Sequence, residues 1–297
     1  MSVMSIKRGI MVINNINTTA EAVTLMEKHL RNELLKKDGE IIKKKLWENT
    51  YIKHQIDRRL RGESFDIKDH IRAIVYSMLS SRISWSRVES GIDIKTGKIS
   101  PLDEIFHNYD PDFLLKCNPD ELAEKIKELG CASQSTRKQM KALIHTNIPK
   151  ILKLQEEYSS VDIFYKKLID IDCSLKTLVL ILSSADSKYK FFEMGEALVA
   201  EYLKNVGYDI AKPDRHICRI LGSNYLACSN CETVPIYETI DIVAELANIL
   251  NKSADEVDYI LWSYCANGYG EICTKNKPKC DVCVANKICK RRTQSHE

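Results

Sequence analysis

The feature that most constrains this chain is a run of four cysteines near its C-terminal end. Cys273, Cys280, Cys283 and Cys289 follow the spacing Cys-x6-Cys-x2-Cys-x5-Cys. Four thiolates in one short loop suit a four-cysteine site, which holds either a cubane iron–sulfur cluster or a zinc ion. A structural zinc site more often uses two separated Cys-x2-Cys pairs, and here only Cys280 and Cys283 form such a pair. We therefore expect a [4Fe–4S] cluster, with zinc or free thiols as the alternatives.

The cysteine loop is also basic. Asp281 is the one acid between Cys273 and Arg292, and the cations among the ligands are Lys275, Lys277, Lys279, Lys287, Lys290, Arg291 and Arg292. A loop coiled around a cluster would present these cations together, and a DNA backbone is the natural partner for such a surface. The alternative is that the cations only offset the negative charge of a four-thiolate cluster. We predict DNA contacts from Lys275, Lys277 and Lys279.

The composition limits the class of protein. A chain of 297 residues can bury two modest cores, and a net charge of +3 means that affinity for nucleic acid must come from local patches. Of the eleven cysteines, the seven outside the loop show no pattern of a small secreted domain, which favours a reducing compartment. No apolar run reaches about 18 residues and no export signal is evident, so we expect a cytoplasmic protein, nucleoid-associated if the source is bacterial.

The apolar pattern predicts helices throughout. One helix, for example, begins with Asn118 as N-cap and Pro119 at its first position, and Gly130 closes it. No segment alternates convincingly as a strand would, so we predict an all-α protein. The expected helices cover residues 18–37, 64–79, 118–129, 134–157, 161–169, 174–183, 194–206, 213–221, 235–250 and 254–265.

A second motif precedes the cysteine loop and carries a family resemblance. The segment 191–222 reads FFEMGEALVAEYLKNVGYDIAKPDRHICRILG. It resembles the helix-hairpin-helix element and catalytic-aspartate loop of the HhH-GPD superfamily of DNA glycosylases. Gly195 matches the second glycine of the hairpin and Asp214 matches the aspartate. The 6-2-5 cysteine spacing is similar to the iron–sulfur loop of the endonuclease III family, and the resemblance covers roughly residues 66–292.

The resemblance implies a fold and a partner. Two helical lobes are expected, a six-helix barrel with the hairpin over residues 66–208, and an iron–sulfur lobe formed by residues 1–65 together with 209–297. Double-stranded DNA containing a damaged base would bind in the cleft between the lobes, with Asp214 at its mouth. Gly195 would contribute backbone N–H groups that hold a DNA phosphate. We expect a monomer.

Asp214 is the predicted catalytic residue. Cleavage of an N-glycosidic bond builds positive charge on the deoxyribose, and a fixed carboxylate near C1′ can stabilise that charge and orient the attacking water. The alternative is an ordinary N-cap aspartate, which many helical proteins have. His216, two residues later, is expected to be a hydrogen-bonding residue of the turn.

Departures from the family pattern refine the prediction. Bifunctional members carry a lysine two residues after the second hairpin glycine, where it attacks C1′ and forms a Schiff base. Here that position is Ala197. We therefore predict a monofunctional glycosylase, which uses water and leaves an abasic site. One alternative is a glycosylase with lyase activity that uses another lysine. The other is a catalytically inactive DNA-binding protein, because the hairpin lacks one glycine and the proline of the family pattern.

A base flipped out of the duplex needs a wedge and a pocket. Arg82 aligns with the family position that inserts a side chain into the gap, and Tyr76 and Trp85 are candidate stacking residues of the base pocket. The alternative is that these aromatics belong to the core. Tyr76 also stands where adenine-mismatch glycosylases carry a general acid. A base that is already a good leaving group, such as a cationic alkylated purine or an activated pyrimidine, therefore fits better.

Overall fold

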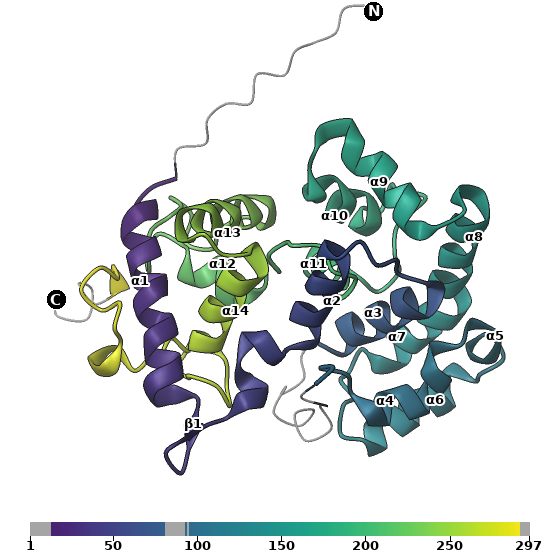
Figure 1. Ribbon diagram of the computed structural model, residues 1–297, viewed down its shortest axis with the longest axis horizontal. Coiled ribbons are helices and arrows are strands. Elements are labelled where there is room, and N and C mark those ends of the chain that lie inside the picture. Colours follow the sequence, from purple (N-terminus) through teal and green to yellow (C-terminus); the bar gives the residue numbers. More distant parts are fainter. Residues whose placement is uncertain (1–12, 81–92, 94, 292–297) are drawn as a thin grey trace, which may run out of the picture.

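The computed structural model describes residues 13–80, 93 and 95–291 (Figure 1). Within these residues the chain is helical, apart from one small hairpin of two-residue strands, β1 (Lys36–Lys37) and β2 (Glu40–Ile41). The prediction of an all-α protein is confirmed. The predicted helix 18–37 is shorter than expected, because α1 spans Ile16–His29, continues as a π-helical turn over Leu30–Leu34 and then gives way to the hairpin.

A first hydrophobic core gathers the helices from the middle of the chain. α3 lies at its centre, packed against α11, and ten of its thirteen residues are buried. We call this part the barrel lobe. Its helices are α2 (Tyr51–Leu60), α3 (Ile67–Leu79), α4 (Ser100–Ile105), α5 (Pro111–Leu114), α6 (Pro119–Glu128), α7 (Thr136–Ala142), α8 (Ile148–Tyr158), α9 (Val161–Asp172), α10 (Leu175–Ser183) and α11 (Glu196–Asn205).

The start of α3 shows how local sequence fixes these elements. Asp66 accepts a hydrogen bond from the Asp69 amide at 2.8 Å, and the Asp69 carboxylate accepts from the Asp66 amide at 3.3 Å. This reciprocal capping box satisfies backbone donors that a helix start leaves unpaired. The helix that follows can then bury nearly its whole length.

A second core combines the two ends of the chain. α1 packs against α13 (Ile236–Leu250) and α14 (Ala254–Cys265), and α12 (Arg215–Ile220) packs against α14. The residues after α14 complete this core with Ile272 and Ala285. We call this part the cysteine lobe, and Figure 1 shows purple α1 beside green α13 and α14.

Two segments connect the lobes. The first, Lys43–Thr50, leads from the hairpin after α1 to α2 and contains two short 3-10 turns, Lys43–Lys45 and Trp47–Asn49; we call it the strap. The second is the loop from Val206 to Asp214, which carries the chain from α11 to α12. Both connections run past the same cavity, which is described below.

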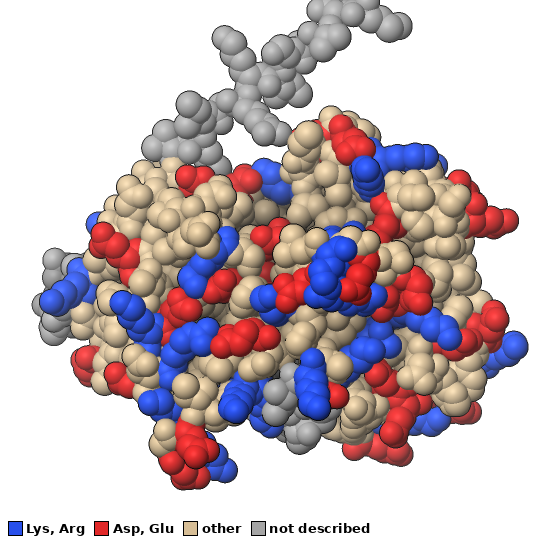
Figure 2. Space-filling model, viewed as in Figure 1, with Lys and Arg blue, Asp and Glu red and all other residues tan. Residues whose placement is uncertain are grey.

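The surface carries charges of both signs. Figure 2 shows lysine and arginine side chains interspersed with aspartate and glutamate over the visible face, in agreement with the small net charge of +3. No helix in the described part of the chain combines the length and the apolar character that a membrane span requires.

Candidate active site

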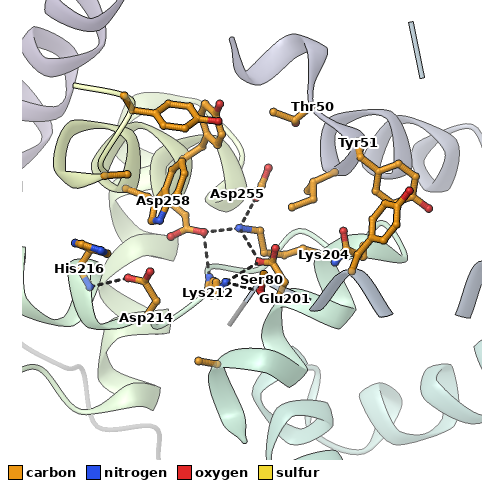
Figure 3. Close-up of a pocket in the computed structure, with 18 of the residues that line it drawn as sticks. Thr50, Tyr51, Ser80, Glu201, Lys204, Lys212, Asp214, His216, Asp255 and Asp258 are labelled. Carbon is orange, nitrogen blue, oxygen red and sulfur yellow. Dashed lines mark hydrogen bonds and ion pairs between the residues drawn. The ribbon is translucent and has the colours of Figure 1, made fainter. Parts of the chain in front are cut away.

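A cavity of about 660 Å³ lies between the two lobes. Its lining comes from the strap, the starts of α2 and α12, one side of α11, and α14 with the loop that follows it. A volume of this size is typical of a ligand site at an interface between domains. Figure 3 shows Thr50 and Tyr51 on the opposite side of this cavity from Asp214 and His216.

Asp214 lines the cavity as the N-cap of α12. Its Oδ1 accepts hydrogen bonds from the amides of His216 at 2.7 Å and Ile217 at 3.1 Å. Both bonds fall on one oxygen, so Oδ2 is not used by either. Pro213 precedes the cap and has no N–H of its own, and the helix dipole favours a negative charge at this end. The residue is therefore both a helix cap and a half-buried carboxylate in the cavity wall.

His216 stays close to Asp214. Burial lowers the pKa of His216, and the neighbouring Asp214 only partly opposes this effect. The backbone amide of His216, rather than its ring, donates to Asp214, and the buried ring Nδ1 has no hydrogen-bond partner among the described residues.

A buried charge cluster lies beside Asp214, and the sequence did not predict it. Lys204 on α11 lies 2.7 Å from Asp255 and 2.5 Å from Asp258 on α14, and all three side chains are at most 5% exposed. These buried ion pairs therefore join a helix of the barrel lobe to a helix of the cysteine lobe. Burial raises the pKa of Asp258 to about 7, and the ammonium of Lys204 limits the rise.

Lys212 extends this cluster into the cavity. Its Nζ donates to Ser80 Oγ at 3.1 Å and lies 3.7 Å from Glu201, while its amide donates to Asp258 at 3.2 Å (Figure 3). Burial disfavours ionisation of Glu201, but Lys212 and Lys204 outweigh it and lower the pKa of this carboxyl. The cluster thus holds three carboxyl groups and two ammonium groups, and its Lys212 stands two residues before Asp214 in the chain.

Ala197 lies in the cavity lining, on the first turn of α11. The position at which the family resemblance would place a nucleophilic lysine therefore faces the site and carries a methyl group. Lys212 is the lysine that lines the cavity next to Asp214.

Of the residues predicted to form the base pocket and the wedge, the structure describes Tyr76. Tyr76 lines the cavity but is only 4% exposed, and its hydroxyl accepts a hydrogen bond from the Ile99 amide at 2.9 Å. Its ring packs edge-on against Tyr51, with centroids 5.0 Å apart. Tyr76 is thus part of the barrel core. Arg82 and Trp85 lie outside the described residues, and their predicted roles stay predictions.

The turn between α10 and α11 joins two helices that pack against each other, as a helix-hairpin-helix requires. Asn147 holds the turn, since its side chain accepts from the Phe192 amide at 2.8 Å and donates to the Phe192 carbonyl at 3.1 Å. Gly195 is exposed and caps α11, and apart from its neighbours in the chain no described atom lies within 4 Å of the place where a Cβ would stand. The N-terminus of α11 is therefore open to a ligand. The ammonium of Lys190, which precedes this turn, bonds to the Ser183 carbonyl.

The four cysteines of the loop line one small cavity, together with Arg291 and Tyr225. Among the residues that the structure describes, no three His, Cys, Asp or Glu side chains are arranged to hold a single metal ion. A hydrogen bond from Cys265 lowers the pKa of Cys273 to about 7, whereas burial raises the pKa of Cys289 to about 11. Tyr264 reaches the same group, with its hydroxyl 3.8 Å from Cys283 Sγ. Four thiols around one cavity fit a four-iron cluster, in which each cysteine binds a different iron.

The basic residues of the loop lie on the surface. Lys275, Lys277 and Lys279 are exposed, and Lys279 lies 3.9 Å from Glu271. The guanidinium of Arg291 donates a hydrogen bond to the Tyr225 hydroxyl at 2.8 Å. The three lysines are accessible to a partner, as a role in DNA binding requires.

The chain was compared with protein families, curated protein sequences and solved structures, and only the solved structures gave matches. No protein-family model matches the chain, and no curated protein sequence matches it. Two solved structures are similar, both from Methanocaldococcus jannaschii. An 8-oxoguanine glycosylase/lyase in complex with a 15mer DNA containing 8-oxoguanine shares 21% identity, with a TM-score of 0.42, over 74% of this chain and 95% of that chain. An 8-oxoguanine DNA glycosylase shares 18% identity, with a TM-score of 0.45, over 84% and 96%.

Proposed function

We propose that this protein is a DNA N-glycosylase, which hydrolyses the bond between a damaged base and deoxyribose in double-stranded DNA. The observation that supports this proposal most directly is Asp214. It lines a cavity between two lobes, with its carboxylate held by two backbone N–H groups and one oxygen left for a substrate. The hairpin with an open helix N-terminus at Gly195 supplies a site for a DNA phosphate.

The proposed reaction needs little chemistry from the protein. As the N-glycosidic bond breaks, its electron pair leaves with the base and positive charge develops on the sugar. The carboxylate of Asp214 stabilises that charge, and a water molecule attacks C1′ and loses its proton to Asp214 or to solvent. The base takes up a proton, and the strand keeps an abasic site.

The monofunctional form of this proposal rests on Ala197, which cannot act as a nucleophile. Lys212 supports a second candidate, a glycosylase with lyase activity, because its amine lines the cavity beside Asp214. Attack of that amine on C1′ would release the base and form an imine, which permits strand cleavage by elimination. Treatment with borohydride during turnover would trap this imine as a covalent protein–DNA adduct, and Lys212→Gln would abolish the adduct.

The cysteine loop is proposed to bind a [4Fe–4S] cluster through Cys273, Cys280, Cys283 and Cys289. Bound there, the cluster would supply structural rigidity, since hydrolysis of a glycosidic bond involves no electron transfer. The chain would use it to hold the exposed lysines of the loop in place. Iron and acid-labile sulfide analysis of protein purified without oxygen tests the cluster against zinc.

The activity is tested by base release. The protein is incubated with DNA that has been alkylated, deaminated or oxidised, including a duplex with 8-oxoguanine, and freed bases are identified by mass spectrometry. We expect one class of base to be released by the wild-type protein. Binding of all these duplexes without release of any base would overturn the glycosylase proposal in favour of a DNA-binding protein.

A further inference from the structure

The loop between α11 and α12 is bound at two points to α14. Near the start of the loop, the Asp209 carboxylate accepts hydrogen bonds from the Ala254 and Asp255 amides at 3.1 and 2.9 Å. It thereby satisfies two donors that the start of α14 leaves unpaired. Near the end of the loop, the amide of Lys212 donates to Asp258 at 3.2 Å. One helix of the cysteine lobe therefore fixes both ends of this connection.

The second of these points lies next to Asp214. The Asp214 amide donates to the Lys212 carbonyl at 2.7 Å, and this bond closes a three-residue turn around Pro213. The pyrrolidine ring of Pro213 fixes its own φ angle, so the turn has little freedom to change shape. A displacement of the Lys212 amide would therefore move Asp214 with it.

Asp258 can hold this amide because its own carboxylate is fixed. Its Oδ2 accepts both from the Lys212 amide and from the ammonium of Lys204, which lies at 2.5 Å, and its side chain is only 4% exposed (Figure 3). Lys204 belongs to α11 of the barrel lobe, and the carboxylate cannot turn away from it without giving up a buried ion pair. The other partner of that ammonium, Asp255, accepts instead from the indole of Trp47.

We infer that Asp258 is a positioning residue for Asp214. Through the turn around Pro213 it determines where the Asp214 carboxylate stands in the cavity wall, and Lys204 ties that position to the barrel lobe. The inference rests on the proposed function, in which this carboxylate must lie near C1′ of the sugar. A misplacement of about 1 Å in a reacting group can slow a reaction by about 100-fold, so the buried charge cluster has a part in catalysis as well as in joining the lobes.

Two nearly isosteric variants separate the hydrogen bond from the charge. Asp258→Asn removes the charge but keeps an oxygen for the Lys212 amide, whereas Asp258→Leu removes both. In single-turnover release of the base that the wild-type protein excises, Asp258→Leu should be slower by about 10-fold or more. Asp258→Asn should stay within about 3-fold of the wild-type rate. Asp258→Ala takes the place of the leucine variant if that protein does not fold.

A double-mutant cycle with Asp214→Asn tests whether the effect runs through Asp214. In that background Asp258→Leu should slow release by less than about 3-fold, because the carboxylate to be positioned is already gone. Asp255→Leu is the matched control. It removes the other buried carboxylate that pairs with Lys204 but leaves the bond to the Lys212 amide, and it should release base within about 3-fold of the wild-type rate.

Three results would overturn the inference. The first is a wild-type rate of release by Asp258→Leu. The second is equal slowing by this substitution with and without the Asp214 carboxylate, which would mean that the two residues act independently. The third is equal slowing by Asp258→Leu and Asp255→Leu with equal losses in melting temperature, which would assign the effect to the lost ion pairs. If the wild-type protein releases no base at all, the proposed function fails instead, so the two failures are distinguishable.

Discussion

The barrel lobe and the cysteine lobe are stabilised in different ways. The barrel lobe buries large side chains in a continuous core, which also contains a chain of buried hydrogen bonds, His70–Tyr202–Tyr165, with lengths of 2.7 and 2.9 Å. The cysteine lobe takes α1 from one end of the chain and a four-thiol loop from the other. The candidate site uses groups from both, so the geometry of the site depends on what holds the lobes together.

Lys204 is the most direct test of that junction. Lys204→Met should lower the free energy of unfolding by about 3–5 kcal/mol, because Asp255 and Asp258 would remain buried without their cation. Urea denaturation at neutral pH measures the change. Lys176→Met is the matched control, since it breaks a 2.7 Å ion pair with Asp241 whose partners are 36% and 37% exposed. That change should cost about 1 kcal/mol or less, and equal destabilisation in the two variants would contradict a buried junction.

Asp214 tests the site that the two lobes form together. Asp214→Asn should reduce base release by about 100-fold or more, because the amide cannot stabilise positive charge on the sugar. Stability should hardly change, since asparagine is as good an N-cap as aspartate. Asp110→Asn replaces the corresponding cap of α5, which accepts from the Asp112 and Phe113 amides, and should leave release unchanged. Full activity of Asp214→Asn would remove the catalytic assignment.

His70 tests the barrel lobe alone. Burial lowers its folded-state pKa from 6.5 to about 4, so the unfolded chain binds the additional proton between these values. Stability should therefore be complete above pH 6.5 and fall as the pH drops toward 4, by about 3 kcal/mol in total from this residue. Urea titrations at several pH values measure the slope. His70→Gln should remove this part of the slope, whereas a substitution of exposed His145 should retain it.

The basic loop tests the cysteine lobe alone, with the smallest expected effect. Lys275→Gln combined with Lys279→Gln should weaken binding to undamaged duplex DNA. The salt dependence of the logarithm of the binding constant should decrease by about 0.9 for each phosphate that these lysines neutralise in the wild-type protein. Fluorescence anisotropy at several salt concentrations gives this slope. Lys36→Gln with Lys37→Gln removes two exposed charges from the β-hairpin and should leave it unchanged. Equal slopes for both pairs would mean that the loop does not bind DNA.

The helical class and most element positions could be predicted from sequence, because capping signals and apolar periodicity are local. Predicted helices at 118–129 and 254–265 correspond to α6 and α14 to within a residue or two. The start of α1 lies two residues before the predicted one. Thr18 and Glu21 match the sequence pattern of a capping box. In the structure Asn15, in a left-handed conformation, is the N-cap instead. Thr19 is buried, and its hydroxyl lies 3.1 Å from Cys228 Sγ. Tertiary packing decided that boundary.

The charge cluster could not be predicted in the same way. Asp255 and Asp258 look like ordinary acids in the first turns of a helix, and Lys204 follows Glu201 and precedes Asn205, so it looks like an ordinary lysine on a polar helix face. The partners of that lysine lie about fifty residues away, and only the tertiary arrangement of α11 and α14 brings them together. Tyr76 was predicted from sequence to line the base pocket, and it does line the cavity. The sequence did not reveal that its hydroxyl accepts a hydrogen bond from the Ile99 amide and that its ring belongs to the core.

The path of the chain through the two lobes has a consequence for biosynthesis. α1 leaves the ribosome before its packing partners α13 and α14 and before the cysteine loop, and the whole barrel lobe lies between them in the chain. The barrel lobe can fold while α1 remains without its partners, because some two hundred residues separate α1 from α13 in the chain. Nascent chains should therefore expose the apolar face of α1 to chaperones over that interval, and the cavity can form only after α14 and the loop that follows it have been made.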